Sequence, residues 1–157
     1  MAVTSNDFAQ IPDHMTMTDD AASFVEGLRR EDIPDEAIHI GKRCMLDAAG
    51  LYVAGSEEHS VHILIDEARH TGGRADARLL GGGGIKVPVG IAARVLGTAG
   101  HAHDWDDTQV SVDPAHVYGL LTHPTIPPLT AALTVGQMLG GVDGKRLMTA
   151  FQAGVEV

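Results

Sequence analysis

The sequence is poor in cysteine, with Cys44 as its single example. One thiol cannot close a disulfide within the chain, complete a zinc ribbon or hold an iron–sulfur cluster. Aromatic residues are also few, at 4% of the chain, whereas small apolar residues and glycine are frequent. Small side chains let helices approach one another closely, so this composition favours packed helices over a sandwich of aromatic-rich strands.

Positive charge is scarce as well. Lysine and arginine number 11 against 21 aspartates and glutamates, which gives a net charge of −10. Such a surface repels a phosphate backbone, so we expect no nucleic-acid partner. No apolar stretch reaches about 18 residues without a charge or a break, and the first residues lack the basic and apolar regions of a secretory signal. We therefore expect a cytoplasmic protein with no membrane partner.

The residues that are present predict helices. Hydrophobic residues make up 44% of a chain of 157, enough for one domain with a core. Apolar residues recur every three to four positions in six stretches, which predicts helices at 19–30, 36–53, 59–70, 89–102, 127–139 and 144–157. Residues 77–80 could form an extended piece. The expected fold class is therefore all-α, with about six helices and at most one short strand.

Most of the chemistry gathers in the stretch GTAGHAHDWDDTQ, residues 97–109. Two histidines, three aspartates and a tryptophan fall within seven consecutive residues, directly after a helix of small residues that we expect to be buried. A carboxylate at the end of a buried segment is costly unless a neighbour pairs with it or a reaction uses it. We also expect Trp105 to be covered. A metal site, a proton-transfer site and a solvated loop are the three interpretations.

A metal site is the weakest of the three. His101 and His103 stand two apart, a frequent spacing of metal ligands. Residues two apart on a helix point about 200° away from one another, so these imidazoles would not converge. The pattern His-x-His-x-Asp-His of dinuclear zinc hydrolases also fails, because Trp105 stands where it needs aspartate. We therefore expect no metal here. The stretch GGGGIK does not match a phosphate loop, since valine follows its lysine, and we interpret it as a flexible turn.

His123 is the second candidate, because it lies just ahead of a predicted helix N-terminus. The positive end of the helix dipole favours anions, which suits a carboxylate substrate beside a proton-transferring imidazole. The alternative is a histidine that simply caps the helix. His116, in a predicted loop over 109–122, stays open. The remaining histidines on predicted helices are interpreted as surface or packing residues: His39, His59, His62 and His70.

From residue 18 onwards, four stretches in this order resemble the amino-terminal part of one family: TDDAASFVEGLRREDIPDEA, KRCMLDAAGLYVAGS, GTAGHAHDWDDT and HPTIPPLTAALTVGQMLGGVDGKRLMTAFQAGVEV. They are similar to the MmgE/PrpD family, which includes 2-methylcitrate dehydratase, cis-aconitate decarboxylase and iminodisuccinate epimerase. The combination of H-x-x-D-aromatic-D-D-T with a downstream H-P-T is specific, whereas either piece alone would be weak.

The resemblance implies a large all-helical domain, a smaller α+β domain and a homodimer. It also implies metal-independent proton abstraction and donation on small di- or tricarboxylates, without a cofactor. Family members are roughly three times as long as this chain. We therefore expect residues 1–17 to be a flexible lead-in and residues 18–157 an incomplete helical domain, with the α+β domain absent. A second polypeptide would complete the fold.

By motif, Asp104 and Thr108 match polar active-site positions of the family, and His123 matches its active-site histidine. We expect His123 to be the acid or base, Asp104 to assist it, and Thr108 to bind a substrate carboxylate. The second choices for the site are Asp106, together with His103 and Asp107 as further substrate-binding residues. Asp107 alternatively caps or braces the loop.

The function expected from this resemblance is part of a metal-independent lyase, either a dehydratase or a decarboxylase, acting on a small di- or tricarboxylate. One alternative is an epimerase or isomerase of a small dicarboxylate. Another is a non-catalytic helical subunit, or a truncated fragment that needs a partner chain.

Overall fold

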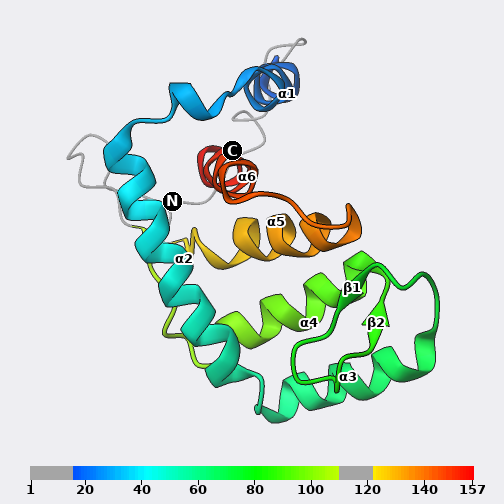
Figure 1. Cartoon of the computed structure of the whole chain (residues 1–157). Coiled ribbons are helices and arrows are strands. Elements are labelled where there is room, and N and C mark those ends of the chain that lie inside the picture. The colour runs from blue at the N-terminus through cyan, green and yellow to red at the C-terminus, as the bar shows by residue number, and fades with distance from the viewer. Residues whose placement is uncertain (1–15, 110–121) are drawn as a thin grey trace, which may run out of the picture.

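The computed structural model describes residues 16–109 and 122–157. Within them the chain forms six α-helices, one short 3₁₀ turn at Arg30–Asp32 and one two-stranded hairpin (Figure 1). The helices are α1 (Met17–Gly27), α2 (Asp35–Gly55), α3 (His59–Thr71), α4 (Val89–His101), α5 (Ile126–Met138) and α6 (Gly144–Glu156). This confirms the all-α class. Among the described helices, none combines the length and the apolar character that crossing a bilayer requires.

The hairpin departs from the expectation of at most one strand. Strand β1 (Ala77–Arg78) pairs antiparallel with β2 (Lys86–Val87), with Ala77 opposite Val87. Two residues are too few to show the alternation of a strand, so β2 could not be seen in the sequence. The glycines between the strands supply the turn, since Gly81, Gly83 and Gly84 all have positive φ angles.

Two further expectations concern the chain's less regular parts. Residues 1–15 of the expected lead-in, and His116 with most of the expected loop over 109–122, lie outside the described residues. Met17, which was assigned to the lead-in, already belongs to α1.

Helix α4 lies at the centre of the arrangement. In Figure 1, α2 runs along one side of the molecule, α5 lies beside α4, and α6 packs on α5. Helix α3 and the hairpin cover the other side of α4. One core lies between α3, the hairpin and α4: Val61, Ile65, Ala68, Ala77, Leu79, Val87, Ala92, Val95 and Ala99. The second lies mainly between α2, α5 and α6: Ile33, Ile38, Ala48, Tyr52, Ile126, Leu129, Met148 and Phe151.

Glycines allow the carboxyl end of α4 to pack closely against two other helices. A Cβ at Gly55, the last residue of α2, would overlap the carbonyl oxygen of Ala99. A Cβ at Gly100 would lie 2.7 Å from Tyr52 Cε1 and 2.8 Å from Ile126 Cδ1. Both positions therefore require the absence of a side chain, and this close packing fixes where the chain leaves α4.

Candidate active site

Two parts of the chain meet beyond the carboxyl end of α4. The chain leaves α4 at His101, and it is described again from Thr122, just ahead of α5. The backbone N–H of Gln109 donates to the carbonyl oxygen of Thr122 at 2.8 Å, and the two residues form an isolated antiparallel bridge. This bridge brings His123 next to the aspartate-rich stretch that follows α4.

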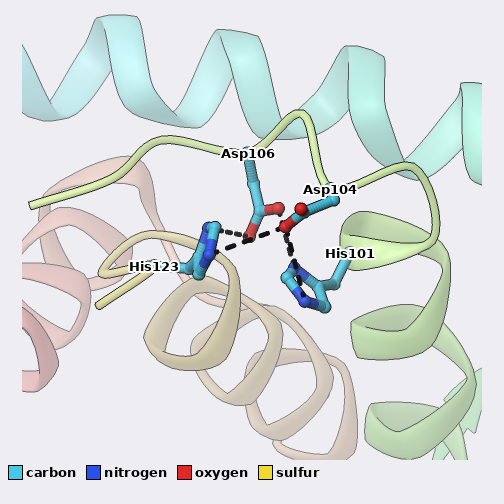
Figure 2. Close-up of side chains that lie close together, drawn as sticks. All are labelled: His101, Asp104, Asp106 and His123. Carbon is cyan, nitrogen blue, oxygen red and sulfur yellow. Dashed lines mark hydrogen bonds and ion pairs between the residues drawn. The ribbon is translucent and has the colours of Figure 1, made fainter. Parts of the chain in front are cut away.

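Four side chains converge there: His101, Asp104, Asp106 and His123, which we call the His–Asp cluster (Figure 2). Asp106 lies between the two histidines. Its Oδ1 is 2.8 Å from His101 Nδ1, and its Oδ2 is 3.3 Å from His123 Nδ1. Asp104 Oδ1 lies 3.7 Å from His123 Nε2 and 4.0 Å from His101 Nε2. Each imidazole therefore faces a carboxylate from both of its nitrogens.

Burial distinguishes the members of the His–Asp cluster. The Asp106 side chain is 1% exposed and that of His123 is 33% exposed, whereas Asp104 and His101 are mainly exposed to solvent. Asp106 Oδ2 and His123 Nδ1 are buried, yet neither has a hydrogen-bond partner within the part of the chain that the structure describes. A sealed carboxylate of this kind is stabilised when a neighbouring group carries positive charge or donates a hydrogen bond.

A turn at Asp104 produces this convergence. Its φ of +56° lies in the left-handed region, which aspartate tolerates better than most residues. Its N–H donates to the carbonyl of His101 at 3.1 Å, which closes the turn directly after α4. The chain reverses here instead of continuing as a helix, so Asp104 and Asp106 both face His101.

His103, expected to bind substrate, lies outside the His–Asp cluster. Its Nε2 is 3.6 Å from Glu58 Oε1, and its ring stacks on that of Trp105 with centroids 4.3 Å apart. His101 and His103 thus have different partners and do not converge. The expectation that Trp105 is covered is wrong, because Trp105 is 67% exposed. After the turn at Asp104 the chain runs along the surface, and Asp106 rather than Trp105 turns inward.

Asp107 and Thr108, the other two expected substrate ligands, also have different surroundings. Asp107 Oδ2 accepts a hydrogen bond of 2.6 Å from Thr125 Oγ1, and its Oδ1 accepts one of 3.3 Å from the Thr125 backbone N–H. Thr125 directly precedes α5, so Asp107 braces the start of that helix, which is the alternative drawn from the sequence. Thr108 is exposed beside it.

A cavity of about 620 Å³ opens beside the His–Asp cluster. His101, Asp106 and His123 contribute its polar part, and the facing sides of α4 and α5 contribute small or apolar residues such as Gly97 and Ala131. The volume suits a small organic molecule. No lysine or arginine lies among its described lining residues, so within that part of the chain the cavity carries no permanent positive charge.

Tyr52 lies beneath the site and links α2 to α5. Its hydroxyl is 2.8 Å from Thr130 Oγ1, and Thr130 also lines the cavity. Burial raises the pKa of Tyr52 above its ordinary value of 10.0, and the negative charge of Asp106 raises it further, while the hydrogen bond with Thr130 acts in the opposite direction. The charge of Asp106 thus affects the ionisation of a buried side chain in the core.

Two features of the site were not predicted from the sequence. His101 belongs to the site, and Asp106 lies at its centre. Both stand in the stretch that was singled out, but Asp106 was only a second choice. The motif contains three aspartates within four residues, and nothing local indicates which of them turns inward. The signal that could have identified Asp106 is its position five residues after His101. That spacing becomes informative only when the helix is known to end at His101.

The fold and the site together define a helical domain that places histidines and carboxylates beside a cavity of small-molecule size. The family to which it belongs follows from comparison with known sequences. The MmgE/PrpD N-terminal domain matches residues 19–157, and the chain belongs to that family, as the motifs indicated.

Two relatives with an assigned activity are both cis-aconitate decarboxylases. The human protein is 31% identical over 148 residues, and the mouse protein is 28% identical over 145 residues. Each alignment covers 90% of this chain but only 28% of the relative. The family is therefore one that contains lyases, and the chain spans little more than a quarter of the length of these two members.

Proposed function

We propose that the chain is part of a lyase that acts on a small di- or tricarboxylate by moving a proton, without a metal ion, and that His123 is the acid/base group. The observation that supports this most is the position of His123, which lies between Asp104 and Asp106 at the wall of the cavity. The relatives named cis-aconitate decarboxylase support both the reaction type and the substrate class.

We infer different tasks for the two carboxylates from their positions. Asp106 is sealed from solvent and faces His123 Nδ1, so it orients the ring and stabilises the imidazolium that forms when the ring takes a proton. This leaves Nε2 as the nitrogen that exchanges a proton with substrate. Asp104 is exposed and lies 3.7 Å from that nitrogen, where it assists the proton's passage.

The described lining of the cavity lacks lysine and arginine, which suggests that another segment supplies positive charge to the site. A substrate with two or three carboxylates needs cationic partners, and the described lining of the cavity offers none. We infer that a second polypeptide, or another part of a longer protein, supplies them from the opposite wall. A homo-oligomer, as the family resemblance implies, is part of the same proposal. The chain's coverage of 28% of its relatives fits a site assembled from several segments.

The test is proton exchange in deuterated water. The chain is co-expressed with the polypeptide encoded beside it, and the complex is incubated with citrate-, aconitate- and succinate-type acids. NMR then follows deuterium entering substrate or product. A lyase changes the composition of the mixture, whereas an epimerase exchanges the proton and leaves the constitution of the acid unchanged.

His123→Ala is the decisive variant in that assay. Loss of an acid/base group lowers turnover by about 100-fold or more. His39→Ala, at an exposed position of α2, is the matched control and should retain full turnover. Treatment with a chelator should not lower the activity of the unaltered complex. Turnover close to normal in His123→Ala would rule out the proposed role of this residue.

A further inference from the structure

We propose that the His–Asp cluster also binds a divalent transition-metal ion of the zinc type, and that this ion blocks the site. Two buried atoms carry the inference. Asp106 Oδ2 and His123 Nδ1 lie 3.3 Å apart, and neither has a hydrogen-bond partner among the residues described. Both belong to groups that ligate zinc. The binding stands by itself, whereas the inhibition rests on the proposed function.

The distances are close to those of a metal site. One donor atom from each of the four residues lies within 4.8 Å of the other three. Zinc holds nitrogen and oxygen ligands at about 2.0–2.2 Å in a tetrahedron, which places neighbouring ligand atoms roughly 3.3–3.6 Å apart. The separation of 3.3 Å between His123 Nδ1 and Asp106 Oδ2 already lies in this range. The remaining donors lie within 4.8 Å, so their side chains would have to rotate inward to surround the ion.

The donor set selects the class of metal. Two imidazoles and two carboxylates suit zinc and its neighbours in the first transition row, whereas magnesium and calcium prefer ligands that are all oxygen. Two carboxylates also balance the charge of a divalent ion. The ion would satisfy the sealed carboxylate of Asp106, which otherwise remains with one oxygen unpaired.

The sequence pointed to a different pair of histidines. His101 and His103 have a familiar ligand spacing, but His103 stacks on Trp105 and lies beside Glu58. The turn at Asp104 replaces His103 with His123 as the partner of His101, with ring centroids 4.8 Å apart. The site therefore combines residues from the ends of α4 and α5, which no local spacing could reveal.

A metal at this position would oppose the proposed reaction. When zinc binds His123 Nδ1, the ring's remaining proton stays on Nε2, which then has no free lone pair. His123 could therefore not take a proton from substrate. The ion would also occupy the polar end of the cavity where a substrate has to approach. Zinc is thus a reversible inhibitor of the site and takes no part in turnover.

The binding is tested by calorimetric titration of zinc chloride into the full chain. Cobalt(II) serves as a second probe, because its absorption spectrum reports tetrahedral coordination. We expect one ion per chain, with affinity reduced at least 10-fold in each of Asp106→Asn, His101→Ala and His123→Ala, and unchanged in His39→Ala. Far-UV circular dichroism checks that each variant retains its helices. Absence of saturable binding, or an affinity in all three cluster variants equal to that of the unaltered chain, would overturn the metal site.

The inhibition is tested in the complete assembly that carries activity. We expect turnover to fall as zinc reaches the concentration that saturates the cluster, and to return when a chelator removes it. Zinc bound at the cluster with turnover unchanged would overturn the inhibition and the catalytic role of His123, while leaving the metal site intact. Inhibition that persists in His101→Ala after zinc binding at the cluster is lost would overturn the inhibition through this site, and would leave both the metal site and the proposed function intact.

Discussion

Asp106 is the residue through which the two histidines are connected. Its two oxygens face His101 Nδ1 and His123 Nδ1, and its side chain is almost completely sealed from solvent. Neither histidine is held in this way by Asp104, which is exposed and farther from both rings. We therefore propose that Asp106 is a positioning residue whose charge as well as shape matters to the proposed reaction.

Asp106→Asn tests that role in the complete assembly, because the amide keeps the size and removes the charge. We expect kcat to fall by about 100-fold or more, as on loss of general acid–base assistance, with little change in KM, since the substrate is held elsewhere. A raised KM with an unchanged kcat would indicate that Asp106 has no part in positioning His123 for the reaction.

Tyr52 gives a prediction about stability at alkaline pH. Its pKa is raised in the folded chain, so an unfolded chain releases the phenolic proton first, from about pH 10. The stabilisation is complete below pH 10 and is lost as the pH rises through the pKa of the folded state. The slope for this one proton is at most about 1.4 kcal/mol per pH unit.

Urea unfolding across the alkaline range, followed by circular dichroism, compares the original chain with Tyr52→Phe. At neutral pH the variant should be about 1 kcal/mol less stable, because the contact with Thr130 Oγ1 is gone. Above pH 10 the two free energies of unfolding should converge. Parallel curves throughout would contradict the raised pKa.

At the scale of elements, the crossing of α2 and α4 sets the position of the site. Gly55 meets the backbone of Ala99 there, two residues before α4 ends at His101. Any side chain at Gly55 would push the carboxyl end of α4 away from α2. The His–Asp cluster begins at that end, so the crossing and the site are structurally coupled.

Gly55→Ala should therefore lower the free energy of unfolding by about 1–3 kcal/mol, as overpacking does. Gly50→Ala is its matched control in the same helix, because a Cβ there meets nothing within 4 Å. It should raise stability by up to about 1 kcal/mol, since alanine is the better helix former. Urea midpoints of the two variants provide the comparison. Equal stability of both variants would contradict the close packing assigned to Gly55.

The elements themselves were predicted well where a helical period runs for ten residues or more. The helix expected at 59–70 is α3 (His59–Thr71), and the one expected at 127–139 is α5 (Ile126–Met138). The first helix was displaced, since α1 ends at Gly27 rather than near residue 30. Strand β2 was missed because two residues carry no period. Periodicity identifies long elements and fails on short ones, whose conformation depends on neighbours distant in sequence.

At the scale of the whole molecule, large apolar side chains remain on the surface of α2. Leu46 is 76% exposed and Val53 is 65% exposed, and their spacing of seven places them on one side of the helix. Exposed apolar residues aligned on one helix face are typical of a surface that another chain covers. This agrees with a chain that spans 28% of its relatives.

The chain by itself should consequently self-associate. Light scattering after size exclusion should give masses above 16.5 kDa that grow with concentration. The double variant Leu46→Lys with Val53→Lys should return the mass to that of a monomer with unchanged helical content. A monomeric mass of the original chain at all concentrations would show that this face of α2 does not mediate self-association.

The sequence alone determined the family, the all-helical class and the stretch that carries the chemistry, because helical periods and family motifs are written in neighbouring residues. It also directed attention to His123 and to the aspartates after α4. Only the tertiary structure decided that Asp106 faces both histidines, that His103 turns away and that Asp107 braces α5. Those outcomes depend on the left-handed turn at Asp104 and on the packing that brings the end of α4 to the start of α5. Contacts between segments so far apart in the chain leave no local pattern in its sequence.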